Sequence, residues 1–162
     1  MTTPAAVHAR LGEIGATVGV AESLTGGQLS AALTEPPGAS TTVRGGLVVY
    51  ATDLKSVLAG VSEALLAERG AVDPEVALAL ARGARSRLGA TFGLGVTGVA
   101  GPDPQDGKAV GTVFAAVAGP QREIVREHHF VGGRAAIRAA AVQVCLDLLL
   151  AECGADPDGY VR

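Results

Sequence analysis

Aromatic side chains are scarce in this chain of 162 residues, which has two Tyr, three Phe and no Trp. So few rings give no platform on which the bases of a single-stranded nucleic acid would stack. Acidic and basic residues are interspersed, and the formal net charge is −3. This balance lacks the basic patch of a nucleic-acid-binding protein and the attraction to an anionic membrane surface. We therefore expect no nucleic-acid partner and no membrane partner.

The sequence also lacks a disulfide framework and a long apolar run. Its two cysteines, Cys145 and Cys153, lie eight residues apart in one expected helix, where a rise of about 1.5 Å per residue would separate them by about 12 Å. A disulfide needs Cα atoms within about 7 Å. No segment resembles the apolar core of a signal peptide, and none is long enough to span a bilayer. We expect reduced thiols in a cytoplasmic protein.

Apolar residues make up 48% of the chain, which excludes a disordered chain and allows a buried core. With few aromatics, that core must consist of Ala, Val, Leu and Gly, which favours closely packed helices on a sheet. We expect one domain over residues 1–162, with 154–162 as a loose tail.

Strand-like and helical segments alternate along the chain. The apolar, β-rich runs that we interpret as strands are 17–22, 45–51, 91–98, 111–119 and 122–130, the last two joined by a Gly-Pro hairpin turn. Expected helices are 4–14, 28–35, 52–60, one that begins at Ser62, 74–89 and 134–153. Strands that alternate with helices pair in parallel through right-handed crossovers. The predicted fold is an α/β three-layer α/β/α sandwich with a mixed sheet of about five strands, one of them antiparallel.

A Ser-Leu-Thr-Gly-Gly turn follows the first expected strand. In an open α/β sheet, ligands bind outside the carboxyl ends of the strands, so the Ser23 hydroxyl would face the cleft. Free N–H groups of the next helix, which glycines at 26 and 27 make accessible, would favour a phosphate or a developing oxyanion. The alternative is an ordinary turn in which Ser23 or Thr25 caps the helix.

Tyr50 and Lys55 follow the second expected strand. Lys55 would lie in the first turn of a helix capped by Thr52 or Asp53, where the helix dipole disfavours an ammonium group. Burial in a cleft would lower the pKa of this lysine further, and a partly neutral lysine can take the proton of a serine hydroxyl. The alternatives are a solvated surface lysine and a half-buried strand tyrosine.

A Gly-, Pro- and Asp-rich loop follows the third expected strand. Thr97 and the backbone amides of Gly98, Ala100 and Gly101 could donate to a carbonyl or phosphate oxygen. Residues 93–98 also match the Gly-x-Gly-x-x-Gly pattern of dinucleotide-binding proteins. We reject that interpretation because the glycines would fall inside the strand, no helix follows, and no acidic residue ends a strand at the required distance.

Arg134 and Arg138 share one face in the first turns of the last helix. Arginines at this end oppose the helix dipole, which favours a nearby anion, although two solvated arginines are an equal alternative. Metal chemistry is disfavoured, because His128 and His129 point to opposite faces of a strand and no Cys/His cluster has ligand spacing. We expect His8 on the surface of the first helix, and neither a metal nor an organic cofactor.

The chain resembles the CinA C-terminal domain family from about residue 5 to residue 150. The segments that carry the resemblance are AESLTGG (21–27), GGLVVYATDLKSVLAGV (45–61), GAVDPEVA (70–77), GVTGVAGPD (95–103), KAVGTVF (108–114) and FVGGRAAIR (130–138). Several separate motifs in the same order are far more specific than any one of them.

The resemblance implies a nicotinamide-nucleotide amidase. Such an enzyme hydrolyses the carboxamide of nicotinamide mononucleotide (NMN) to nicotinate mononucleotide and ammonia, with a lysine-assisted serine and no cofactor. By motif position, Ser23 is the nucleophile and Lys55 its base, while Thr97 and nearby amides stabilise the oxyanion. Tyr50 either orients Lys55 or stacks on the pyridinium ring. The expected substrate-binding residues, including candidates for the 5′-phosphate, are Thr25, Gly26, Gly27, Gly98, Ala100, Gly101, Arg134 and Arg138.

The chain departs from the family pattern in two respects. Leu24 stands where many relatives carry cysteine, and the larger N-terminal domain to which this module is often fused is missing. We therefore expect the domain to act alone, without nucleotide pyrophosphatase activity, and the resemblance suggests a homodimer. Two alternatives are a non-catalytic nucleotide-binding module associated with competence or the DNA damage response, and an amidase that acts on a different pyridine nucleotide.

Overall fold

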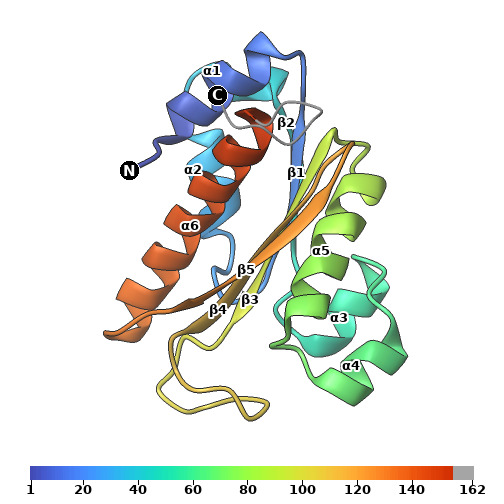
Figure 1. Ribbon diagram of the computed structural model, residues 1–162, viewed down its shortest axis with the longest axis vertical. Coiled ribbons are helices and arrows are strands. Elements are labelled where there is room, and N and C mark those ends of the chain that lie inside the picture. Colours follow the sequence, from blue (N-terminus) through green and yellow to red (C-terminus); the bar gives the residue numbers. More distant parts are fainter. Residues whose placement is uncertain (155–162) are drawn as a thin grey trace.

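A five-stranded sheet forms the middle layer of the computed structural model, which describes residues 1–154 (Figure 1). The strands are β1 (Val18–Glu22), β2 (Val43–Val48), β3 (Phe92–Gly98), β4 (Thr112–Ala118) and β5 (Glu123–His129). Their order in space is β2-β1-β3-β4-β5. β1 pairs in parallel with β2 and β3, whereas β4 pairs antiparallel with β3 and β5. The predicted mixed sheet with one antiparallel strand is confirmed.

Helices cover both faces of this sheet (Figure 1). On one face lie α1 (Pro4–Glu13), α2 (Gln28–Thr34) and α6 (Arg134–Gly154). On the other face lies α5 (Pro74–Arg87), flanked by α3 (Thr52–Val57) and α4 (Glu63–Arg69). A short 3₁₀ turn, η1 (Ala39–Thr41), leads into β2. The three-layer sandwich predicted from the sequence is therefore also confirmed.

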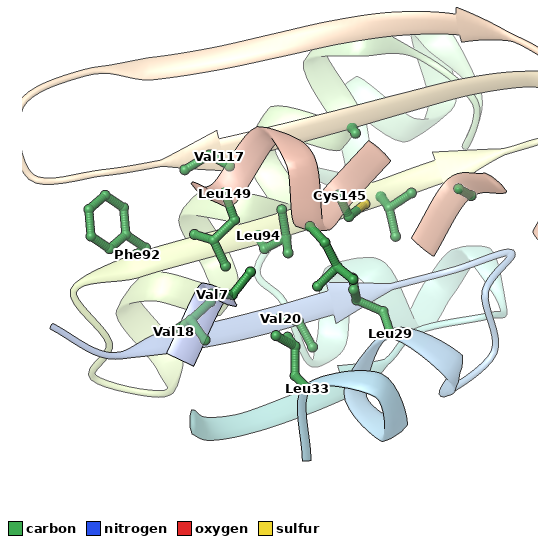
Figure 2. Packing of buried hydrophobic residues seen from close by; sticks show 14 of the residues in the cluster. Val7, Val18, Val20, Leu29, Leu33, Phe92, Leu94, Val117, Cys145 and Leu149 are labelled. Atoms are coloured by element: carbon green, nitrogen blue, oxygen red, sulfur yellow. The ribbon is translucent and has the colours of Figure 1, made fainter. Parts of the chain in front are cut away.

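Small aliphatic side chains build the core between the sheet and α1, α2 and α6. Figure 2 shows Val18, Val20 and Leu94 from the sheet packed against Leu29 and Leu149 from the helices. All five are essentially inaccessible to solvent. A chain poor in aromatics therefore excludes water by interdigitating branched aliphatic side chains, which supply most of the folding free energy.

Two glycines inside β3 allow α5 to lie directly on the strand. A Cβ atom added to Gly93 would collide with the Ala81 carbonyl, and one added to Gly95 would collide with the Ala77 carbonyl. Both glycines lie within the Gly-x-Gly-x-x-Gly pattern at 93–98. The pattern therefore arises from close packing of a helix on a strand rather than from nucleotide binding.

The structure corrects several predicted boundaries around β2 and α3. β2 runs over 43–48 instead of 45–51, because its partner β1 ends at Glu22 and the last parallel contact is the Val49 amide on the Glu22 carbonyl. Tyr50 therefore lies beyond the strand. α3 ends at Val57 instead of residue 60, and Ala51 is its N-cap, so the predicted caps Thr52 and Asp53 are wrong.

His8 is half-buried, and its predicted surface position is wrong. Its ring contacts the Thr42 hydroxyl, directly after η1, and the Leu33 carbonyl in α2. On α6, Cys145 and Cys153 are buried free thiols, and burial raises the pKa of Cys153 to about 12. In the predicted tail, Gly154 ends α6, and residues 155–162 lie outside the described residues. Over residues 1–154, no helix is long and apolar enough to cross a membrane.

Candidate active site

Ser23 and Lys55 meet where the carboxyl ends of β1 and β2 lie side by side. Ser23 directly follows β1, and its amide donates to the Val96 carbonyl of β3 at 3.1 Å. Lys55 lies on α3, which begins four residues after β2 ends. The Lys55 Nζ is 3.0 Å from the Ser23 Oγ, and both side chains are buried. The sheet order therefore joins two residues that are 32 positions apart.

The surroundings of Lys55 suit an uncharged amine. Burial lowers its pKa from 10.5 to about 8, against the opposing effect of the negative charge on Asp106. The Nζ contacts the Val49 carbonyl at 2.8 Å and the Tyr50 carbonyl at 3.2 Å. A neutral amine has two N–H groups and one lone pair. If the two carbonyls accept the two N–H groups, the lone pair is left to accept the Ser23 hydroxyl.

The reason given from the sequence for a lowered Lys55 pKa is incomplete. α3 has six residues, so Lys55 also lies in its last turn, where the helix dipole no longer disfavours a cation. Loss of solvation on burial is the main cause of the lowered pKa.

The turn after β1 is organised by Glu22, a buried carboxylate that the sequence analysis did not single out. One carboxylate oxygen accepts from the Thr25 hydroxyl at 2.7 Å and from the Gly27 and Leu29 amides at 2.8 and 3.1 Å. The other oxygen accepts from the amide and the hydroxyl of Ser30 at 2.8 and 2.6 Å. The N-terminal N–H groups of α2 are thus occupied by a residue of this chain, and the expectation that they are free is wrong. The sequence did contain a signal for this role, because Glu22 is an acidic residue at the end of an otherwise apolar strand.

Neither Ser23 nor Thr25 caps α2. Gly27 is the N-cap residue, in the left-handed region at φ 100°, and Gly26 before it has φ 57°. These glycines make the sharp turn that brings the start of α2 back over the Glu22 carboxylate.

The backbone amides nearest Ser23 that stay available belong to the turn itself and to the end of β3. Within residues 1–154, the N–H groups of Leu24 and Thr25 have no hydrogen-bond acceptor. At the end of β3, the Val99 amide donates to the Thr112 carbonyl. Because bonded positions alternate along an antiparallel ladder, the Gly98 amide points away from β4, toward β1. These amides are the candidates for binding an oxyanion.

Arg138 binds the carbonyl groups of the serine turn and does not line the cavity. Its Nε donates to the Leu24 carbonyl at 2.9 Å and its Nη2 to the Thr25 carbonyl at 3.1 Å. Thr25, Gly26, Gly27 and Arg138 do not line the cavity next to Ser23. Three of these predicted substrate-binding residues therefore lie in the turn that carries the nucleophile, and the fourth, Arg138 on α6, holds that turn in place.

A cavity of about 340 Å³ opens beside Ser23 and Lys55. The rest of its wall comes from the turn after β1, the segment after β2, the 71–72 segment, the end of β3, the following loop and the start of α6. These residues are Leu24, Tyr50, Ala71, Val72, Thr97, Gly98, Val99, Ala100, Gly101, Pro102, Asp103, Pro104, Gln105 and Arg134. In Figure 1 the loop after β3 and the start of α6 lie at the same end of the molecule as α3 and α4. Eight of the twelve predicted site residues thus surround one cavity.

Thr97 is buried in the cavity wall with its hydroxyl hydrogen already engaged. The Oγ1 donates to the Ala71 carbonyl at 2.7 Å. A hydroxyl has one hydrogen and two lone pairs, so in this arrangement Thr97 offers a ligand an acceptor. This differs from the donor role expected from the sequence.

Arg134 and Tyr50 form the rim of the cavity. One Arg134 nitrogen donates to the Gly101 carbonyl at 2.8 Å and another to the Tyr50 hydroxyl at 3.0 Å. Both side chains are exposed, and Tyr50 is 58% accessible. The Tyr50 carbonyl, and not its side chain, is the group that contacts Lys55. The guanidinium therefore remains accessible to an anionic group of a ligand.

Among residues 1–154, no three His, Cys, Asp or Glu side chains gather as a metal site would require. His128 stacks on Phe130 with ring centroids 5.7 Å apart, whereas His129 contacts Glu127 at 3.0 Å. The two histidines therefore project from opposite faces of β5, as predicted.

Comparison with known proteins identifies the family. Residues 2–153 match the CinA C-terminal domain. A CinA-like protein of Frankia casuarinae is 53% identical over 134 residues, which cover 83% of this chain and 31% of that protein. A CinA-like protein of Acidobacterium capsulatum is 49% identical over 136 residues, or 83% of this chain and 33% of that protein. The chain thus spans about a third of the length of these relatives.

Solved structures agree with this assignment. The competence/damage inducible protein CihA from Agrobacterium tumefaciens superposes with a TM-score of 0.85 at 36% identity, covering 91% of this chain and 93% of that one. A CinA superfamily protein from Escherichia coli gives a TM-score of 0.88 at 31% identity, covering 91% and 86% of the two chains. By fold, by motif order and by these matches, the chain belongs to the CinA C-terminal domain family.

Proposed function

We propose that this domain is an amidohydrolase that converts NMN to nicotinate mononucleotide and ammonia. The observation that carries the proposal is the 3.0 Å contact between Lys55 Nζ and Ser23 Oγ at the wall of a cavity. A serine becomes nucleophilic when a positioned base within hydrogen-bond reach takes its proton. A lysine with a pKa of about 8 is suited to that task near neutral pH.

The acylation step follows from the positions of these groups. Neutral Lys55 takes the hydroxyl proton of Ser23, and the Ser23 oxygen forms a bond to the carboxamide carbon. In this proposal the amides of Leu24 and Gly98 donate to the resulting oxyanion, and one such donor contributes about 10²–10³-fold in rate. The Thr97 oxygen accepts from the carboxamide N–H₂ and orients it. Lys55 then protonates the leaving nitrogen, which departs as ammonia.

Hydrolysis of the acyl-enzyme regenerates the serine. Lys55 is neutral again after it protonates the leaving group, so it accepts a proton from water, whose oxygen attacks the ester carbon. The ester bond breaks, Lys55 returns the proton to the Ser23 oxygen, and nicotinate mononucleotide leaves. The same amine thus acts as base and acid in both halves of the reaction.

The cavity suits a mononucleotide in size and charge. Its volume of about 340 Å³ lies at the lower end of the range of about 300–1,000 Å³ found for small-molecule sites. Arg134 at the rim provides a cation for the 5′-phosphate, and the exposed Tyr50 ring provides a flat surface for the pyridinium. Arg138 supports the nucleophile turn in this account and leaves the phosphate to Arg134.

The test is ammonia release from NMN by the purified domain. The wild-type chain should release ammonia in proportion to nicotinate mononucleotide formed, Ser23→Ala should not, and Ser40→Ala, an exposed serine on η1, should match the wild type. Nicotinamide riboside, which lacks the phosphate, should react with a higher KM.

Two results would redirect the proposal. Absence of turnover on every pyridine nucleotide would favour the non-catalytic binding module. Faster turnover of a pyridine nucleotide other than NMN would keep the Ser23 chemistry and change the substrate.

A further inference from the structure

The loop between β3 and β4 is tied to the segment between α4 and α5 by one carboxylate. The Oδ2 of Asp106 accepts from the Ala71 amide at 2.8 Å and from the Val72 amide at 3.3 Å. Asp106 itself has φ 50°, in the left-handed region that few residues other than glycine adopt. A Cβ atom at Gly70 would come within 2.6 Å of the Asp106 Cγ, so the carboxylate packs directly on the Gly70 backbone.

The peptide groups of Ala71 are held from two sides. Asp106 accepts from its N–H, and the Thr97 hydroxyl donates to its carbonyl at 2.7 Å. Ala71 and Val72 both line the cavity and are both buried. Without Asp106, two buried amides would have no acceptor among residues 1–154, which costs far more than a lost surface contact. One wall of the cavity thus depends on a side chain from a loop 35 residues away.

Resting on the proposed function, we infer that Asp106 is a positioning residue of this site: it fixes the cavity wall at Ala71 and Val72 and, with it, the direction of the Thr97 hydroxyl. The mechanism above assigns Asp106 no contact with the substrate.

Burial lowers the Lys55 pKa, and the negative charge of Asp106 acts in the opposite direction and raises it. Other ionisable groups near Lys55 are Asp53 on its own helix, and Asp103 and Arg134 in the wall of the same cavity. Loss of the Asp106 charge removes an attraction for the ammonium and leaves the burial effect unopposed. The Lys55 pKa therefore falls below about 8, and the fraction of neutral amine at pH 7 rises from roughly one molecule in ten.

The experiment is a pH titration of Lys55 in protein labelled at the lysine Cε, followed by carbon-13 NMR. The chain has two lysines, Lys55 and Lys108, so Lys108→Arg assigns the two signals. Asp106→Asn, which keeps an acceptor oxygen for the amides, should lower the Lys55 pKa by several tenths of a unit. Asp103→Asn is the matched control: it removes the same charge from the same loop and should shift the Lys55 pKa less. Equal shifts in both variants, or none in Asp106→Asn, would overturn the electrostatic part.

Steady-state kinetics test the positioning part. Asp106→Ala should raise KM for NMN several-fold, and Asp106→Asn should restore most of it while moving the acid limb of the kcat/KM profile to lower pH. An unchanged KM in Asp106→Ala would overturn this part. The titration needs no substrate, so failure of the wild type to hydrolyse NMN would refute the proposed function and leave the inference on the Lys55 charge to be decided by NMR.

Discussion

The proposed reaction depends on the protonation state of one residue, Lys55. Its amine lies among a serine hydroxyl and two backbone carbonyls, and the residue is 1% accessible to solvent. An ammonium group in such a place loses most of its hydration, and three hydrogen bonds replace only part of it. The lysine is therefore ready to exchange a proton near neutral pH, which an exposed lysine is not.

The first prediction concerns the pH dependence of activity. Only neutral Lys55 can accept the Ser23 proton, so kcat/KM for NMN should rise with pH and reach half of its plateau near pH 8, where the lysine loses its proton. The check is a kcat/KM profile from pH 6 to 10. A profile that is flat across pH 8, or that falls there, would contradict the assignment of Lys55 as base.

The second prediction concerns stability. Because the Lys55 pKa is lower in the folded chain than in the unfolded chain, the unfolded chain binds more protons between pH 8 and pH 10.5, and wild-type stability should rise across that window. The gain relative to Lys55→Met should amount to about 3 kcal/mol at most. Urea unfolding of both proteins at several pH values measures it. Parallel stability curves for the two proteins would show that the pKa of Lys55 is not lowered.

At the scale of elements, α2 and the serine turn depend on the carboxylate that ends β1. Glu22 accepts five hydrogen bonds from the turn and from the first residues of α2. Arg138 of α6 holds the carbonyls of the same turn. The position of the Ser23 hydroxyl is thus fixed by a strand end and two helices, before any substrate binds.

The third prediction is that Glu22→Gln destabilises the fold and lowers activity. The amide nitrogen of glutamine would face N–H and O–H donors in place of a carboxylate oxygen, so buried donors would lose their acceptor. The expected loss is about 2–4 kcal/mol in the free energy of unfolding, with kcat reduced more than KM is raised. Glu35→Gln, an exposed position at the end of α2, should stay within about 0.5 kcal/mol of the wild type. Equal stability of the two variants would show that the Glu22 carboxylate does not stabilise the turn and the start of α2.

The fourth prediction tests the contact between α5 and β3. Gly95→Ala places a Cβ atom on the Ala77 carbonyl, so either the helix must move away or the strand must bend. A loss of about 1–3 kcal/mol is expected from this overpacking. Gly12→Ala in α1 meets no atom within 4 Å and should be neutral or stabilising, as is usual for this exchange in a helix. Thermal unfolding of both variants separates the two cases, and a Gly95→Ala protein as stable as the wild type would disprove the close contact.

At the scale of the whole molecule, the sequence predicted the layers, the sheet and the meeting of Ser23 with Lys55. Strand and helix patterns alternate clearly, and residues that follow neighbouring parallel strands meet at one edge of the sheet. The roles of Glu22 and Asp106 were not predicted, because their contacts follow no periodic pattern in the sequence. The carboxylate of Glu22 reaches amides up to eight residues ahead through a left-handed turn, and Asp106 bridges two loops. Neither contact follows a helical or strand period.

The pairing of Ser23 with Lys55 is tested most directly by the rate of NMN hydrolysis in Ser23→Ala, Lys55→Met and the double variant. Residues that act as one unit have strongly non-additive effects. Each single substitution should lower kcat/KM by about 10⁴-fold or more, and the double variant should be no slower than the slower single variant. Substantial hydrolysis by Ser23→Ala, or losses that simply multiply in the double variant, would contradict a shared role in one proton transfer.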